Sequence, residues 1–389
     1  MKIKQVFIPV FSSFLIPFFM IALIISCRPK QKKIERYTEN GVEVIVNHLE
    51  PYRIEGEPNT LHLEEEFSID TEKDYVAERG LVDIDKFDVD SEGNIYCIYL
   101  RSRENCIYKF DKNGNFVSAF SRKGQGPGEL SPLSAMSINN HDEIIIQNIF
   151  QPKLLVLSSD GNLIKEIPAP ANLPDIKQIK NENYFFYETS RIGPQTAQMV
   201  WGILSPKFEK IKDIEKQELH GDSGKFNYEL HKSYTTEENI YIGKRSPSYE
   251  IWVYSSEGNL KRIIKKNYRP IKISDEYKEE RVKRREDMKK KGFRPPPAKL
   301  FFPEYWPAFH DLFADETGWL FVMTYEISNN PREFVYDIFN PDGIFIGKFS
   351  LDNYKGMYNP LPVKAKNNRI YCLREKENGY KELAVYNMK

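Results

Sequence analysis

Short apolar runs separated by glycine-bearing turns dominate the pattern of the chain, most clearly over residues 86–120. Four runs of strand length follow one another there, and Gly93 and Gly114 lie in the first and third turns. Such Asp/Gly and Asn-Gly turns are hairpin signals because glycine accepts positive φ at low steric cost. The segment therefore predicts four sequential strands, the last three over Asn94–Leu100, Cys106–Asp111 and Phe116–Phe120.

This unit recurs with a period of about 47 residues. Clear copies carry their turn glycines at Gly161, Gly258 and Gly343, and the longer last step contains an insertion. A degenerate copy fills the gap before Gly258, and a partial copy ends the chain, which makes six units. The degenerate copy has strands at Tyr184–Thr189 and Met199–Leu204, and the partial copy has strands at Arg369–Arg374 and Leu383–Met388.

The strands of these units are apolar on both sides, as in Ile95–Leu100. Such strands need cover on both faces, and sheets stacked radially around an axis provide it. The sequence therefore predicts an all-β, six-bladed β-propeller over residues 61–389. A β-sandwich of irregular strands is the alternative, and the regular period argues against it.

Closure of the ring gives a further expectation. The sixth unit lacks a fourth strand, whereas Leu61–Ile69 precedes the first unit without a sheet of its own. Pairing the two removes two exposed strand edges, which are a liability in a sheet protein. We therefore expect residues 61–69 to lie beside residues 383–388 and to close the last blade.

One glycine-rich phrase suggests a family. Gly124-Gln125-Gly126-Pro127-Gly128-Glu129-Leu130 is followed by Pro132, strands and an Asp-Gly turn. This arrangement resembles the NHL-repeat type of propeller, and more closely the six-bladed propeller lipoproteins of Bacteroidetes and related bacteria, over roughly residues 60–389. The resemblance implies the fold, and little about function, because most members of that family have no assigned activity.

The amino terminus has the features of an export signal. Lys2 and Lys4 are followed by an uncharged stretch, Val6–Ile25, and then by Ser26-Cys27. This ending resembles the lipobox of bacterial lipoproteins, which implies cleavage before Cys27 and lipidation of its thiol. We thus expect a signal peptide over residues 1–27, a tether and extension over 28–60, and attachment to the cell envelope, at the outer membrane or the periplasmic face. An uncleaved membrane anchor is the alternative.

Composition narrows the chemistry. Lys and Arg together number 56, as do Asp and Glu, so no global charge favours nucleic acid. The six histidines show no HExxH pairing and no CxxC occurs, so the sequence predicts no metal, no cofactor and no catalytic residue. We interpret the glycines at 124–128 and the acidic phrase Asp88–Gly93 as turns rather than phosphate or calcium loops. Cys97, Cys106 and Cys372 are expected to be buried free thiols rather than a disulfide and a thiol.

An insertion at residues 266–308, between the fourth and fifth blades, is expected to be helical. Ser274 is a good N-cap, acidic residues follow it, and Lys289–Lys291 with Gly292 end the helix before a proline run. The charged helix offers no wide apolar face. Tyr305 and Trp306 lie in the aromatic run that follows, and we expect this run to pack on the propeller, with an exposed patch for a partner as the alternative.

In a propeller, the loops between second and third strands and those between blades emerge on one face, here called the loop face. We predict this face as the binding surface because its loops are longer and carry basic residues. The candidate residues for a ligand or partner are Arg101, Arg103, Arg122, Lys123, Arg191, Arg245, Tyr305, Trp306 and Arg332.

Two function classes stay open. The favoured class is a non-enzymatic, monomeric binding or scaffolding lipoprotein for a protein or glycan partner. The alternative is a propeller hydrolase or lyase with a metal in the central channel, which needs converging ligands from several innermost strands. No repeated ligand position appears in the predicted innermost strands.

Overall fold

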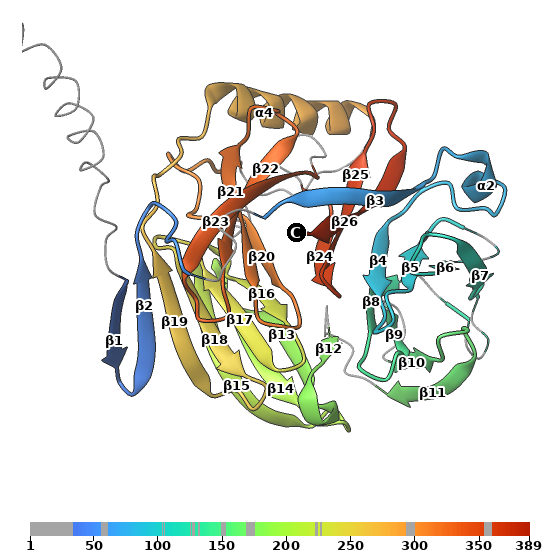
Figure 1. Cartoon of the computed structure of the whole chain (residues 1–389), viewed down its shortest axis with the longest axis horizontal. Coiled ribbons are helices and arrows are strands. Elements are labelled where there is room, and N and C mark those ends of the chain that lie inside the picture. Colours follow the sequence, from blue (N-terminus) through green and yellow to red (C-terminus); the bar gives the residue numbers. More distant parts are fainter. Residues whose placement is uncertain are drawn as a thin grey trace, which may run out of the picture. The chain divides into compact units, whose positions relative to one another are not determined.

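The described residues form six blades of four antiparallel strands in the computed structural model (Figure 1), so the six-bladed propeller is confirmed. The structure describes residues 34–55, 61–102, 104, 106–124, 126, 129–130, 133–148, 153–168, 176–221, 225, 228–292, 300–353 and 360–389. The predicted signal segment with Cys27, and Arg103, lie outside these residues.

The innermost strands face a common axis, and the chain runs outward through each blade (Figure 1). Blade 1 is β4 (Lys86–Val89), β5 (Ile95–Ile98), β6 (Ile107–Phe110) and β7 (Phe116–Phe120). Blade 2 is β8 (Leu133–Ile138), β9 (Ile144–Asn148), β10 (Lys153–Leu157) and β11 (Leu163–Pro168). Blade 3 is β12 (Ile176–Gln178), β13 (Tyr184–Gly193), β14 (Thr196–Leu204) and β15 (Lys210–His220).

The remaining blades follow the same order. Blade 4 is β16 (Lys232–Thr235), β17 (Asn239–Lys244), β18 (Glu250–Ser255) and β19 (Leu260–Lys266). Blade 5 is β20 (Asp311–Ala314), β21 (Leu320–Ile327), β22 (Glu333–Phe339) and β23 (Phe345–Asp352). Blade 6 is β24 (Val363–Lys366), β25 (Arg369–Glu375), β26 (Lys381–Met388) and, from the other end of the chain, β3 (Leu63–Asp70).

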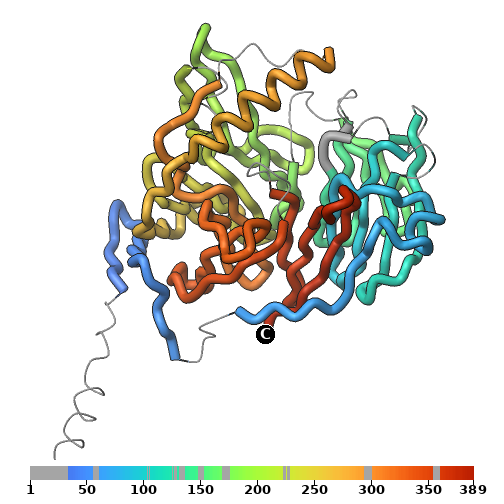
Figure 2. The backbone as a smooth tube through the Cα atoms, turned by 90° about the horizontal axis from the view of Figure 1, so that it is seen from above, coloured from blue at the N-terminus to red at the C-terminus, as the bar shows by residue number. Residues whose placement is uncertain are grey.

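The ring closes as the sequence predicts. Strand β3 pairs antiparallel with β26, with Ile69 opposite Leu383, and Figure 2 shows the two ends of the propeller chain side by side. The amide of His62 donates to Lys389 O at 3.1 Å, and the amide of Lys389 donates back at 2.9 Å. Blade 6 therefore completes its sheet only with a strand that precedes blade 1 in sequence.

The segment before β3 is more ordered than expected. Within the tether and extension expected over residues 28–60, Glu35–Glu39 form β1 and pair antiparallel with β2 (Val42–Asn47). Strand β2 runs parallel to β19 and extends blade 4 to six strands. Asn47 is fully buried, and it donates to Gly343 O at 3.0 Å and accepts from the amide of Phe345 at 2.8 Å. The extension thus links blade 4 to blade 5.

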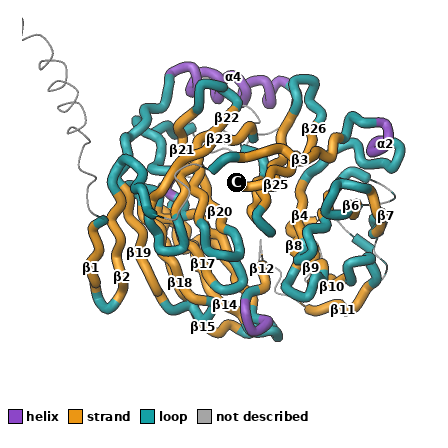
Figure 3. Tube along the Cα trace, in the orientation of Figure 1, coloured by secondary structure: helices purple, strands orange, loops and turns teal. Residues whose placement is uncertain are grey.

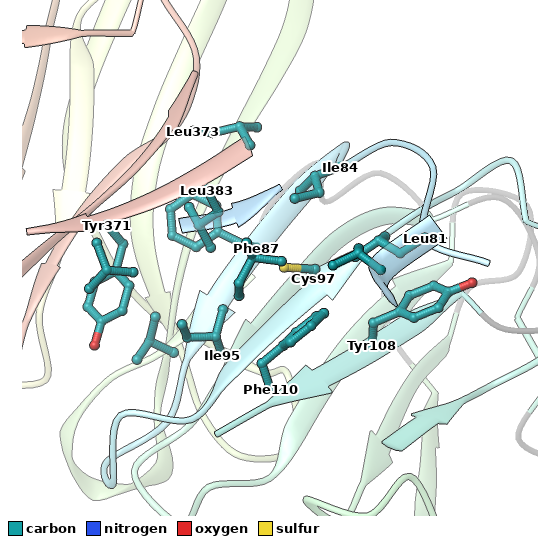
Figure 4. Packing of buried hydrophobic residues seen from close by; sticks show 14 of the residues in the cluster. Leu81, Ile84, Phe87, Ile95, Cys97, Tyr108, Phe110, Tyr371, Leu373 and Leu383 are labelled. Carbon is teal, nitrogen blue, oxygen red and sulfur yellow. The ribbon is translucent and has the colours of Figure 1, made fainter. Parts of the chain in front are cut away.

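Apolar side chains fill the seams between neighbouring blades. Along β5, Ile95 and Cys97 pack toward blade 6, whereas Tyr96 and Ile98 pack toward blade 2. Figure 4 shows the first of these seams, where Phe87 and Cys97 of blade 1 meet side chains of blade 6. Burying one such side chain stabilises the fold by about 1.5–3 kcal/mol, so a strand that is apolar on both sides needs two neighbours. The described cysteines are buried and free, as expected.

The turn glycines also behave as predicted. Gly114, Gly161, Gly258 and Gly343 all have positive φ. At Gly161 an added Cβ would lie only 2.3 Å from the Phe120 ring of the preceding blade. The turn therefore needs glycine both for its backbone conformation and for close packing.

Residues 190–198, which the sequence predicts as a loop, are instead mostly strand. β13 continues to Gly193 and β14 begins at Thr196, so Arg191 pairs with Ala197 in the ladder. The pattern is hard to recognise because the end of β13 is exposed on both faces, at residues 189–192, and lacks the alternation of a half-buried strand.

The insertion folds as predicted. Helix α4 (Asp275–Lys290) is the long helix in Figure 3, and the Ser274 hydroxyl caps it by accepting from the amide of Tyr277 at 3.2 Å. None of its residues is buried. Shorter helical turns are α2 (Asp74–Ala77) and η1 (Lys180–Glu182). Among the described residues, no helix combines the length and apolar character needed to cross a membrane.

Candidate functional site

A polar cavity of about 210 Å³ lies on the axis of the propeller. Every blade contributes its innermost strand or the turn that follows it. The lining residues are Asp88 and Val89 of blade 1, Ser137–Asn140 of blade 2, Lys177–Ile179 of blade 3, Tyr234–Glu237 of blade 4, Ala314 and Glu316 of blade 5, and Lys364–Lys366 of blade 6. We call this space the channel cavity.

The channel cavity lies at the end of the axis opposite to the loop face. Asn140, Glu237 and Glu316 line it, and each belongs to the turn between the first and second strands of its blade. In an antiparallel blade these turns emerge opposite the loops between second and third strands. The cavity and the predicted arginine surface are therefore two different places.

Asp88 forms the best-connected group in the cavity. Its Oδ1 lies 2.5 Å from Lys364 Nζ of blade 6, and its Oδ2 accepts from the amide of Ile138 of blade 2 at 3.1 Å. Burial alone would raise the pKa of this carboxyl, but Lys364, the Val89 amide and Lys177 outweigh burial and lower it. Asp88 is therefore ionised at neutral pH, and it ties three blades together around the axis.

A second pair lies on blades 3 and 4. The Lys177 ammonium sits 4.6 Å from the centroid of the Tyr234 ring, a distance suited to a cation–π interaction. Burial, with the negative charge of Asp88 nearby, raises the pKa of Tyr234, so its hydroxyl stays protonated. The inner part of the cavity thus offers ammonium groups, one carboxylate and one phenol.

The rim of the cavity is acidic. Glu237 accepts from the Asn140 side chain at 3.0 Å, and Glu316 accepts from the amide of Asn367 at 2.7 Å. Both glutamates are exposed, whereas Lys364 and Lys366 are half-buried. Lys366 donates to Val89 O at 2.9 Å. Positive groups therefore lie deeper than the two rim carboxylates.

Gln178 lines the same cavity, but its side-chain oxygen is shielded from the cavity space. Its side-chain Oε1 is inaccessible to solvent and has no hydrogen-bond partner among the protein groups. A buried polar atom left without a partner costs about 1–3 kcal/mol. A bound molecule would reach this oxygen only if the Gln178 side chain moved.

Histidines and metal ligands do not gather in this cavity. His231 stacks on Trp201 at 5.6 Å, and burial together with Lys244 and Arg245 lowers its pKa to about 4. The amide of His310 donates to Met323 O at the start of blade 5. In the part of the chain that the structure describes, no cluster of three or more His, Cys, Asp or Glu side chains could hold a metal ion.

The candidate basic residues of the loop face have varied surroundings. Arg101 and Lys123 are exposed, and Arg122 is exposed while paired with Glu129 at 2.8 Å. Arg191 donates to Pro194 O at 2.7 Å within its own hairpin. Arg332 pairs with Asp352 at 3.1 Å and also donates to Glu375 O. Ligand binding by these residues stays a prediction.

Arg245 requires a correction, because it is only 3% exposed. Its guanidinium donates to Leu230 O at 2.9 Å and to the Tyr325 hydroxyl at 3.2 Å. These partners come from elsewhere in blade 4 and from blade 5, so Arg245 joins a seam and does not belong to an exposed surface.

The two aromatic candidates differ in exposure. Trp306 is buried and stacks on Tyr325 of blade 5 at 4.5 Å, which matches the expectation that the aromatic run packs on the propeller. The rings of Tyr277 of α4 and Trp306 pack in a T-shaped arrangement with their centroids 4.8 Å apart, so this cluster also anchors the helix. Tyr305 remains exposed.

A scan against family models decides the classification. A model of the DUF5128 family, described as 6-bladed beta-propeller, matches residues 83–304, more than half of the chain. The chain belongs to this family. The matched part of this DUF5128 propeller runs from just before blade 1 through most of the insertion after blade 4. No curated protein matches the chain.

Solved structures give weaker likenesses to the DUF5128 propeller. A candidate exported protein of Bacteroides fragilis is 13% identical, with a TM-score of 0.48 and coverage of 89% of this chain and 99% of that chain. A DUF4221 member of Bacteroides vulgatus is 13% identical, with a TM-score of 0.47 and coverage of 85% and 98%. A streptogramin B lyase is 10% identical, with a TM-score of 0.43 and coverage of 85% and 98%. At these values the likenesses carry no inference about ligand or activity.

Proposed function

We propose that this DUF5128 propeller is an extracytoplasmic binding module that holds one small polar molecule in the channel cavity. The observation that carries the proposal is the convergence of six blades on one polar space, with charged and amide side chains where a closed propeller axis could have been packed with apolar ones. Ligand sites are concave and place a few polar groups on a rigid frame. The channel cavity has these properties.

The size of the cavity limits the ligand. Sites for drug-sized molecules have volumes of about 300–1,000 Å³. A cavity of about 210 Å³ is smaller, so it suits a monomer rather than a segment of polymer.

A thermal-shift screen of small, water-soluble molecules tests the proposal. The wild type is compared with Gln178→Trp, which fills the cavity, and with Gln195→Trp, whose side chain lies in the exposed β13–β14 turn. A ligand at 100 times its Kd stabilises the folded state by about 2.7 kcal/mol. We expect at least one molecule to stabilise the wild type and Gln195→Trp but not Gln178→Trp. If every stabilising molecule acts equally on all three proteins, the cavity is not the site.

Export and anchoring form a second part of the proposal. They are supported by Lys2, Lys4 and the uncharged run that ends at Ser26-Cys27. Lipidation at Cys27 is tested by labelling cells with a fatty-acid analogue and comparing the wild type with Cys27→Ser and Cys97→Ser. We expect label in the wild type and in Cys97→Ser. Label in Cys27→Ser would contradict this site of attachment.

A further inference from the structure

We infer that the ligand of the channel cavity is an anionic polyol of about monosaccharide size, with its carboxylate or phosphate directed toward Lys177, Lys364 and Lys366. This inference rests on the proposed function and adds the chemical class of the ligand. It follows from the order of charges along the cavity, from the donors of Lys364 and Lys366, and from the polar groups of the lining.

The order of charges favours an anion at the inner end. Three lysines line the cavity, and Asp88 is the carboxylate in contact with one of them. The other two lining carboxylates, Glu237 and Glu316, are exposed at the rim and accept from backbone or side-chain amides. Water screens exposed charges strongly, whereas half-buried ammonium groups keep more of their field. A negative group of the ligand is therefore most favourable inside the rim, near the lysines.

Two of the lysines retain hydrogen-bond donors. An ammonium group has three N–H donors. Lys364 uses one on Asp88, and Lys366 uses one on Val89 O. The short Lys364–Asp88 contact also shows that an oxyanion fits against this lysine, and a ligand oxyanion can receive the remaining donors. Charge-assisted bonds of this kind are about twice as strong as neutral ones.

The rest of the lining suits hydroxyl groups. The rim carboxylates of Glu237 and Glu316 have further lone pairs. Thr235 adds a hydroxyl from blade 4. A neutral, hydroxylated body between an inner anion and outer acceptors satisfies these groups, and a volume of about 210 Å³ limits that body to one small unit.

Calorimetric titration of the full chain with three matched probes tests the class. Glucuronate carries a carboxylate, glucose 6-phosphate carries a phosphate, and glucose carries neither. We expect at least one anionic probe to bind roughly tenfold or more tightly than glucose, as one charge-assisted contact of about 1.5–3 kcal/mol implies. The preferred anionic probe identifies the group.

Variants assign the preference to the cavity lysines. Lys177→Met should reduce the preference for the anionic probe roughly tenfold, because it removes one ammonium without leaving Asp88 unpaired. Lys165→Met is the matched control, since Lys165 is exposed on the outer strand of blade 2. Lys364→Arg, which keeps the charge, should retain the preference. A preference that survives Lys177→Met and Lys366→Met would overturn the inference.

The remaining outcomes separate the two proposals. If glucose binds as tightly as both anions and Gln178→Trp abolishes its binding, the cavity is a binding site and the anionic class is wrong. If none of the three probes binds, the molecule found in the thermal-shift screen tests the ligand class. A neutral molecule overturns the anionic class, and an anionic polyol supports it. If no molecule depends on Gln178, the proposed function itself fails.

Discussion

Among the lysine–aspartate pairs that bridge neighbouring blades, two have sharply different surroundings. Lys364 and Asp88 join blades 6 and 1 beside the channel cavity, with side chains 24% and 11% exposed. Lys266 and Asp337 join blades 4 and 5 at 3.2 Å, with side chains 4% and 0% exposed. The space beside the second pair is only about 10 Å³, too small for more than a water molecule.

The closed pair is surrounded by aromatic rings. The Lys266 ammonium lies 4.4 Å from the Phe345 ring centroid, and the Tyr249 hydroxyl donates to Asp337 at 2.9 Å. Burial raises the pKa of Asp337 despite Lys266 and Lys348, whereas contacts with Lys364 and backbone amides lower the pKa of Asp88. The same pair of residue types therefore fixes a seam in one place and leaves room for a ligand in the other.

The largest expected effect concerns the closed pair. Lys266→Met leaves the Asp337 carboxyl buried without its ammonium partner, and we expect a loss of about 3–5 kcal/mol in the free energy of unfolding, measured by urea denaturation. Lys261→Met, at an exposed position of the same strand, should stay within about 0.5 kcal/mol of the wild type. The double variant Lys266→Met/Asp337→Leu should recover much of the loss. A small effect of Lys266→Met would show that the seam does not depend on the pair.

Substitution of Asn47 tests how much the N-terminal extension contributes to the stability of the seam between blades 4 and 5. Asn47→Ala removes partners from the Phe345 amide and from Gly343 O, which are buried contacts. We expect a loss of about 2–4 kcal/mol in the same urea assay, from two groups at about 1–3 kcal/mol each. Asn162→Ala, in an exposed turn of blade 2, provides the comparison. Equal stability of the two variants would mean that the extension contributes little to the seam.

The open pair should be less sensitive. Lys364→Met removes one charged hydrogen bond from Asp88, but water can enter the channel cavity, so we expect a loss of about 1.5–3 kcal/mol. The unfolding transition should remain cooperative. A loss larger than that of Lys266→Met would contradict the distinction between the open and the closed pair.

The smallest expected effect is the pH dependence of folding stability, and Asp88 and Asp337 should contribute to it with opposite signs. Because its pKa is lowered, Asp88 stabilises the fold above the ordinary aspartate pKa of about 3.9, and this contribution is lost as the pH falls through the lowered value. Because its pKa is raised, Asp337 is least favourable when ionised, and stability is gained as the pH falls through the raised value. Urea titrations between about pH 2 and 7 should therefore show the wild type losing its advantage over Asp88→Asn on acidification and gaining relative to Asp337→Asn. Parallel curves for the two variants would refute the assignment.

The hydrophobic pattern contained the information for the fold. The turn glycines, the apolar strands and the unpaired Leu61–Ile69 are local signals, and ring closure follows from the cost of open edges. The pairing of β2 with β19 was not predictable in this way. Its partners, such as Glu43 and Arg262, lie about two hundred residues apart, and the apolar pattern of β2 does not identify which strand edge it joins.

The candidate site was less predictable than the fold. Asp88 was interpreted as part of a turn motif, and Lys364 and Lys366 lie in β24, the first strand of blade 6, which carries no turn motif. Charged residues on innermost strands were the available signal, because these strands line the axis. Arg245 shows the reverse problem, since its position in a loop suggested exposure while its partner Tyr325 lies 80 residues further along the chain.

The hairpin that precedes the ring has a mechanical consequence. Tension applied ahead of Ile34 enters the propeller through β1, whose first residue, Glu35, is bonded opposite Val46 near the end of β2. Pulling there loads the Glu35–Val46 pair first, so the hairpin opens one residue pair at a time from that end. Separation of β1 from β2 breaks no pairing of β2 with β19, so the hairpin can extend while the six blades stay paired.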